Sequence, residues 1–168
     1  METKDIFAKL KARMLEGMVF HDEMSRYFSF LNLKNFRRCH EHHYKDETES
    51  YKCLCSYYMR NYNRLIPTEP MARPDVIPQS WYNYERKDVD ANTKRNGVRS
   101  SYEKWIAWES ETKSFYEDMY AELMENGEIA SAVFIERFID DVSEELADAK
   151  EEHIKLESVG YDMAYIAE

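Results

Sequence analysis

The 168-residue chain is long enough for one domain with a hydrophobic core, and its four glycines and four prolines are too few for a β fold with many turns. Its formal net charge of −10 argues against bare nucleic acid as a partner, because phosphate binding needs a basic surface. Cations suit this surface better.

Apolar residues at helical spacing predict a first pair of helices. The first is expected from about Lys4 to Leu31 and the second from about Asn35 to Leu65, which is just before Pro67. Proline disfavours helix at the residue that precedes it, so the second helix should end there. Because the break between the two helices is short, they should form an antiparallel hairpin.

Residues 66–97 have a different composition. All four prolines lie between positions 67 and 78, and Trp81, Tyr82 and Tyr84 follow. Aromatic side chains need a surface to pack on, so we expect an ordered crossover here, with a short helix around Ser80 to Asp88.

A second pair of helices follows the crossover. The third is expected from about Ser100, where Ser100 or Ser101 can cap it, to Asn126, which precedes Gly127. The fourth is expected from about Glu128 to Ser158. The sequence therefore predicts an all-α fold in which residues 1–168 form a single four-helix bundle domain, with two antiparallel hairpins joined by one long crossover.

The cysteines and the apolar runs bear on location. Cys39, Cys53 and Cys55 form no CxxC pair, which favours a reducing compartment. Charged residues interrupt the first apolar residues, so no signal peptide is expected, and no apolar run approaches the roughly 20 residues that span a membrane. We expect a cytoplasmic protein with no membrane partner.

Every predicted helix carries polar residues on its apolar face near mid-length. These are Glu16 and His21 on the first helix; His40, His43, Asp46, Glu47 and Ser50 on the second; Glu109 on the third; and Asp141 and Glu145 on the fourth. Burying a lone carboxylate is costly or forces it to bind a proton. Carboxylates and imidazoles on facing helices can instead share a cation, as they do in di-iron bundles. This set of ligand types suits Fe, Mn or Zn.

The same residues also fit structural roles. Glu16, Asp46 and Glu145 each fit a solvated position at the edge of the apolar face. Glu109 fits a ligand and a buried structural acid equally well, and His43 fits a ligand and a hydrogen-bonded core histidine. The run from 40 to 43 also fits an exposed patch that scavenges metal ions.

Three segments resemble the ferritins, especially the bacterial non-haem type. SYEKWIAWESETKSFYEDMYAEL and FIERFIDDVSEELADAKEEHIKLESVGYDMAYI are similar to the third and fourth helices and tail of that family, and LKNFRRCHEHHYKDETESY is similar to its second helix. The resemblance covers most of the chain outside residues 66–97. It implies a ferritin-like four-helix bundle, a di-iron site and a homo-oligomer, which in ferritins is a cage.

Position by position, the resemblance implies Glu109 as the bridging carboxylate of the third helix and Asp141 as the acid of the fourth. Glu145 or Glu144 would supply an additional acid. Val142 stands where the family has a glutamine.

The first two helices allow more than one register against the family. One register of the second helix gives His43 and Asp46, with the two ligand types exchanged; another gives Glu47 and Ser50, with the histidine lost. On the first helix Glu16 lies one residue from the expected glutamate, and Gly17 takes that place when no gap is allowed.

The leading hypothesis is a metal-binding protein that oxidises Fe(II) at a dinuclear site within the bundle. A bundle that has lost its metal site and serves as an interaction or structural protein is the alternative. A di-metal enzyme that acts on a small organic substrate is a third hypothesis.

Overall fold

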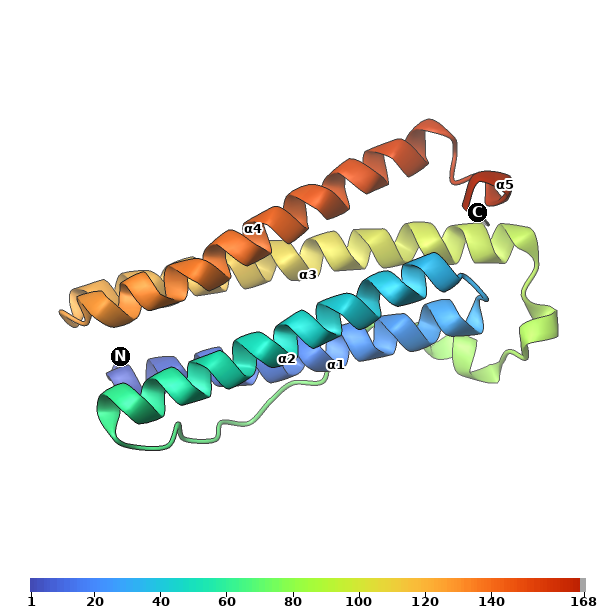
Figure 1. Ribbon diagram of the computed structural model, residues 1–168. Coiled ribbons are helices and arrows are strands. Elements are labelled where there is room, and N and C mark those ends of the chain that lie inside the picture. The colour runs from blue at the N-terminus through green and yellow to red at the C-terminus, as the bar shows by residue number, and fades with distance from the viewer. Residues whose placement is uncertain (167–168) are drawn as a thin grey trace.

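Four long helices pack as two hairpins in the computed structural model, which describes residues 1–166 (Figure 1). The first hairpin consists of α1 (Thr3–Phe30) and α2 (Lys34–Tyr62), and the second consists of α3 (Ala91–Glu125) and α4 (Ile129–Ser158). A short helix, α5 (Met163–Ile166), follows α4 and lies near the start of α3. The helices pack closely within each hairpin, and the hairpins meet mainly through α1 and α3. The predicted four-helix bundle is confirmed.

The helix ends have local causes in the sequence. Asn63 ends α2 with φ of 56°, a left-handed conformation that asparagine tolerates better than most residues. Gly127 and Gly160 follow α3 and α4 with φ of 74° and 60°, where a side chain would be strained. These stop signals explain why the C-terminal ends of the helices lie close to their predicted positions.

The crossover spans 63–90 and not the expected 66–97, because α3 already begins at Ala91, although α2 ends earlier than expected, at Tyr62. The Asp90 side chain caps α3 by accepting a hydrogen bond from the Thr93 backbone N–H at 2.7 Å. The first turns of α3 are polar, so no apolar stripe marks them in the sequence. The short helix expected near 80–88 is present as two 3-10 segments, η1 (Gln79–Asn83) and η2 (Arg86–Asp88).

The crossover follows α1 along much of its length. Lys9 Nζ lies 3.0 Å from Glu69 Oε1, and Arg86 donates a hydrogen bond of 2.7 Å to the Ser29 carbonyl. Trp81 packs edge-on against Tyr27, with ring centroids 5.2 Å apart. The segment is therefore ordered against the bundle, as its aromatic residues predict.

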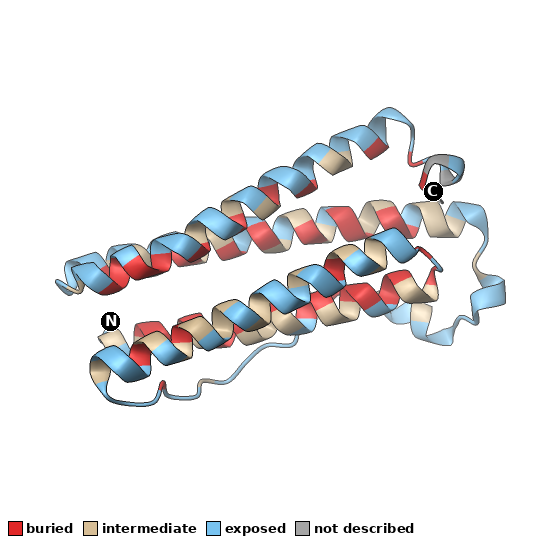
Figure 2. Ribbon diagram, in the orientation of Figure 1, coloured by how far each residue is buried: buried red, intermediate tan, exposed pale blue. Residues whose placement is uncertain are grey.

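The apolar core divides into two blocks along the bundle, and buried residues follow the inner face of each helix (Figure 2). One block contains Met14 and Val142, and the other contains Phe20 and Ala149. Most of the polar residues noted in the sequence lie between the two blocks, but His21 lies beside Phe20 of one block and Asp141 beside Val142 of the other. Within residues 1–166, no helix is long and apolar enough to cross a membrane.

Candidate metal centre

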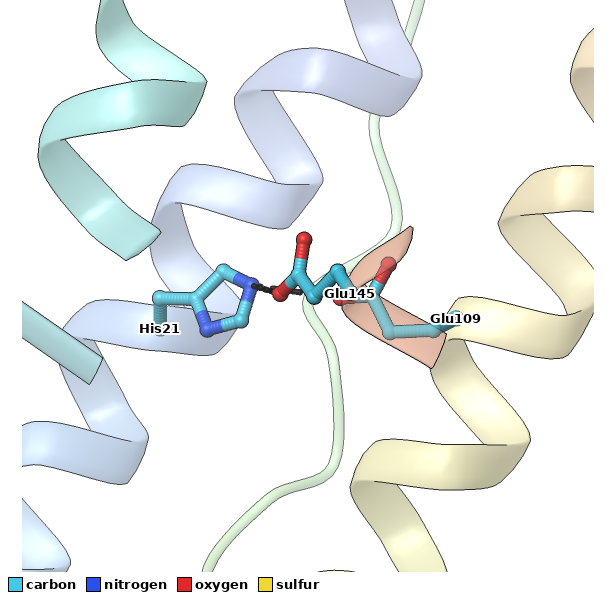
Figure 3. Close-up of side chains that lie close together, drawn as sticks. All are labelled: His21, Glu109 and Glu145. Carbon is cyan, nitrogen blue, oxygen red and sulfur yellow. Dashed lines mark ion pairs between the residues drawn. The ribbon is translucent and has the colours of Figure 1, made fainter. Parts of the chain in front are cut away.

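The polar layer is built around a histidine and two glutamates from three different helices. His21 of α1, Glu109 of α3 and Glu145 of α4 converge, as Figure 3 shows. The His21 Nε2 atom lies 3.2 Å from Glu109 Oε1 and 3.3 Å from Glu145 Oε1. One ligand atom from each of the three residues can be chosen so that all lie within 4.8 Å of one another. His21 is fully buried and Glu109 is 3% exposed, whereas the Glu145 side chain is 16% exposed, so the group meets solvent on the side of Glu145.

Neighbouring side chains fix the orientation of this group. Trp105 donates a hydrogen bond from its indole N–H to Glu145 Oε1 at 3.3 Å. Its ring also lies edge-on to His21, with centroids 6.5 Å apart. On the other side, Phe20 makes an edge-on contact with His21 at 5.3 Å. Aromatic side chains with few rotamers thus hold the imidazole and one carboxylate in place.

Two histidines of α2 complete the layer. The Nδ1 atoms of His21 and His40 lie 3.0 Å apart, and His43 Nδ1 lies 3.3 Å from Glu145 Oε1. Burial lowers the pKa of His40 well below its usual range, and the neighbouring histidines lower it further, so His40 is neutral. A neutral His40 accepts at Nδ1 the hydrogen bond that the His21 Nδ1–H donates. This contact directs Nε2 of His21 at the two glutamates.

The charges of the group are strongly coupled. Burial opposes a charge on His21, but Glu109 and Glu145 outweigh it and raise the His21 pKa to about 10. Burial raises the pKa of Glu109 to about 7, with His21 acting against the rise. Burial also opposes the charge of Glu145, yet His21 and His43 bring its pKa below the usual value. Without a metal ion, a proton on His21 holds the two carboxylates together at neutral pH.

Glu47 of α2 lies next to this group, and Gly17 of α1 makes room for it. A Cβ atom at position 17 would lie 3.0 Å from Glu47 Cδ and Oε1. Burial, together with the charges of Glu109 and Glu145, raises the Glu47 pKa to about 8, while His21 acts in the opposite direction. Glu47 therefore holds a proton most of the time at neutral pH.

An acidic pocket of about 560 Å³ leads to the group between α2 and α4. Glu109 and Glu145 lie at its inner end, and exposed acids including Asp46, Asp141 and Glu144 lie toward its mouth. Such a negative, recessed surface raises the local concentration of cations. The carboxylates of the buried group are thus accessible to an ion from solution.

The seven residues selected from the sequence fall into two sets. Glu109, Glu145, His43 and Glu47 line the pocket at or beside the buried group. The other three, Glu16, Asp46 and Asp141, are placed outside that group. Glu16 accepts a hydrogen bond from the Ala72 N–H at 3.1 Å and lies 3.8 Å from an Arg13 nitrogen, so it faces the crossover. Asp46 pairs with the exposed His42 at 3.2 Å, and Asp141 is exposed at the pocket mouth.

His21 and His40 were not selected as ligands, although both interrupt the apolar face of their helix. One feature of the sequence points to them as ligands: they and His43 are the only histidines at inward positions of α1 and α2. A single histidine on an apolar stripe resembles an ordinary core residue, which explains why this signal is weak.

The donor set fits a transition-metal ion. His21 Nε2 is fully buried, and neither carboxylate contact has the geometry of a hydrogen bond. A deprotonated imidazole nitrogen in this position directs a lone pair at two carboxylate oxygens. That arrangement is repulsive unless a proton or a metal ion lies between the atoms, and imidazole with carboxylate ligands suits Fe, Mn or Zn.

Comparisons with known proteins address the fold. No protein-family model matches the sequence, and no curated protein sequence matches it significantly. A solved structure described as a humanized archaeal ferritin matches with a TM-score of 0.80 and 14% sequence identity, over 99% of this chain and 93% of that one. The likeness covers essentially the whole bundle, including the long crossover. At this level of identity it establishes one conclusion, that the chain has a ferritin-like four-helix bundle fold.

Proposed function

We propose that this protein binds a transition-metal ion, in the first place iron, at the buried group of His21, Glu109 and Glu145. The observation that carries the proposal is the fully buried Nε2 atom of His21, which faces carboxylate oxygens of two other helices at 3.2 and 3.3 Å without hydrogen-bond geometry. A core that needed only stability would be better served by apolar residues, because a buried charged group repays its desolvation poorly.

Iron is favoured for two reasons. The ligand types suit iron, and the chain has the fold of a protein that is named as a ferritin. The sequence resemblance to ferritins points in the same direction, although the structural likeness does not extend to the bacterial non-haem type in particular. Oxidation of Fe(II), a dinuclear centre and assembly into a homo-oligomer remain predictions of that resemblance.

The test is the metal content of the protein from iron-supplemented cells, measured by mass spectrometry for the parent and for Glu109→Gln. We expect stoichiometric metal in the parent and loss of most of it in Glu109→Gln, because the amide cannot supply an anionic ligand. Glu117→Gln, an exposed substitution on the same helix, serves as the matched control and should retain the metal. Substoichiometric metal in the parent would refute the proposal.

The charges of the group also allow a second function. The His21 proton can neutralise the two carboxylates without any metal, as the raised His21 pKa of about 10 indicates. In that case the bundle is an interaction or structural protein, and the parent and Glu109→Gln would both be free of metal. Size-exclusion chromatography of the same samples tests the predicted homo-oligomer.

A further inference from the structure

The turn of the bundle next to the buried group is poor in metal ligands. Position 17 of α1 is a glycine, position 142 of α4 is a buried valine and position 50 of α2 is a serine. Glu47 is the acid that α2 contributes there, and its carboxylate fills the space above Gly17. Among residues 1–166, just one group places three metal-ligating side chains within reach of one ion.

Three of the four side chains lie one helical turn from a position that the ferritin resemblance aligns with the metal site, whereas Glu109 lies at its aligned position. His21 lies four residues after Gly17, His43 four residues before Glu47, and Glu145 four residues after Asp141. Since α1 and α4 run in one direction and α2 runs in the other, all three displacements point toward the same end of the bundle (Figure 1). Four residues of helix correspond to about 6 Å along the bundle axis. Because the three shifts are equal and in the same direction, the ligands lie in one layer of the bundle.

His43 lies beside this layer, and its side chain would have to rotate to become a fourth ligand, because its nitrogen atoms are not among the ligand atoms that lie within 4.8 Å of one another. Its Nδ1 atom and the Nε2 atom of His21 approach the same oxygen, Glu145 Oε1, each at 3.3 Å. Two imidazoles and two carboxylates are sufficient for a tetrahedral site. A pair of metal ions would lie about 3.5–4 Å apart, and the second ion would need donors in the turn that holds Gly17 and Val142.

From this geometry we infer that the centre binds a single metal ion through His21, His43, Glu109 and Glu145, and that Glu47 is a neighbour of the site and not a ligand. The inference rests on the proposed function and specifies its stoichiometry and ligands. It departs from the dinuclear site that the sequence resemblance implies.

The test is equilibrium dialysis of the full-length, metal-free protein against Fe(II) without oxygen, followed by Zn(II), with a chelator in the buffer to remove ions held at the acidic surface. We expect one ion per chain. His43→Gln should weaken binding at least tenfold, whereas Glu47→Gln should leave both the stoichiometry and the affinity within about threefold of the parent. Circular dichroism confirms that each variant is as helical as the parent.

The outcomes separate the two proposals. Two ions per chain, or a loss of binding in Glu47→Gln as large as that in His43→Gln, would overturn the single-ion inference and leave metal binding intact. No bound ion in the parent would overturn the proposed function itself. His21→Gln, expected to abolish binding, provides a second variant if His43→Gln does not fold.

Discussion

Gly97 of α3 lies against Tyr27 of α1 and Trp81 of the crossover. A Cβ atom at this position would lie 2.3 Å from the Tyr27 hydroxyl oxygen and 3.2 Å from Trp81 Cζ2. Contacts of that length do not occur between relaxed side chains, so Gly97→Ala forces the buried Tyr27 ring to move by about 1 Å. Overpacking costs about 1–3 kcal/mol, and a 2.3 Å contact with a buried ring belongs in the upper part of that range, at about 2–3 kcal/mol, while the better helix propensity of alanine returns about 1 kcal/mol.

We therefore expect Gly97→Ala to lower the free energy of unfolding by about 1–2 kcal/mol, or the melting temperature by roughly 3–6 °C for a chain of this length. The assay is urea unfolding followed by far-UV circular dichroism at a fixed protein concentration. Tyr27→Phe is the matched control, because it removes the hydroxyl oxygen and leaves Tyr27 Cζ at an ordinary 3.4 Å.

In the Tyr27→Phe background the 3.2 Å contact with Trp81 Cζ2 remains, so Gly97→Ala should cost clearly less than in the parent and be close to neutral. The reasoning is refuted if alanine is tolerated in the parent, or if it has the same effect in both backgrounds. Either result would mean that the crossover does not press on α3 at this point.

Four further predictions follow from the centre and from the start of α3. His40→Phe removes the acceptor for the His21 Nδ1–H, so metal affinity should fall about 10–100-fold in a chelator competition; unchanged affinity would contradict the role of His40. Since the His21 pKa is raised to about 10 in the metal-free protein, metal binding should release a proton. The metal affinity should therefore rise by up to about tenfold for each unit by which the pH increases, until the pH reaches that pKa. A calorimetric enthalpy that does not depend on the ionisation enthalpy of the buffer would argue against this release. Asp46→Asn combined with Asp141→Asn should slow metal uptake in stopped-flow experiments at low salt, and the difference should shrink at high salt. Asp90→Ala should lower the free energy of unfolding by about 1 kcal/mol because α3 loses its cap, whereas an unchanged urea midpoint would place the start of α3 elsewhere.

The sequence was sufficient to predict the helices where an apolar stripe meets a stop signal. The stripe of α4 and the Asn126-Gly127 pair that ends α3 are examples, and both helices end near the predicted residues. The start of α3 was missed because a capped polar turn has no hydrophobic periodicity. Its position depends on the Asp90 cap and on close packing at Gly97, and the second of these is a tertiary contact that no local pattern reveals.

For the candidate site, Glu109 was predicted on the apolar face of α3 and lies in the buried group. The side chains that face Glu109 depend on how the other helices are aligned along the bundle axis. If α1 shifts by one turn, His21 faces Glu109 in place of Gly17. Periodicity determines which face of a helix is inward, but not which turn faces which. The family resemblance supplied an alignment, and the residues at the aligned turn, Gly17 and Val142, have no ligand atoms on their side chains.

The buried group joins the two hairpins. His21 and His43 belong to the first hairpin and Glu109 and Glu145 to the second, while α2 and α4 leave a pocket between them. An ion bound to all four would act as a cross-link that forms only after the hairpins have docked. Its binding energy would thus suppress separation of the two hairpins, which is a sub-global opening that native-state hydrogen exchange detects. Binding would have little effect on fraying within each hairpin.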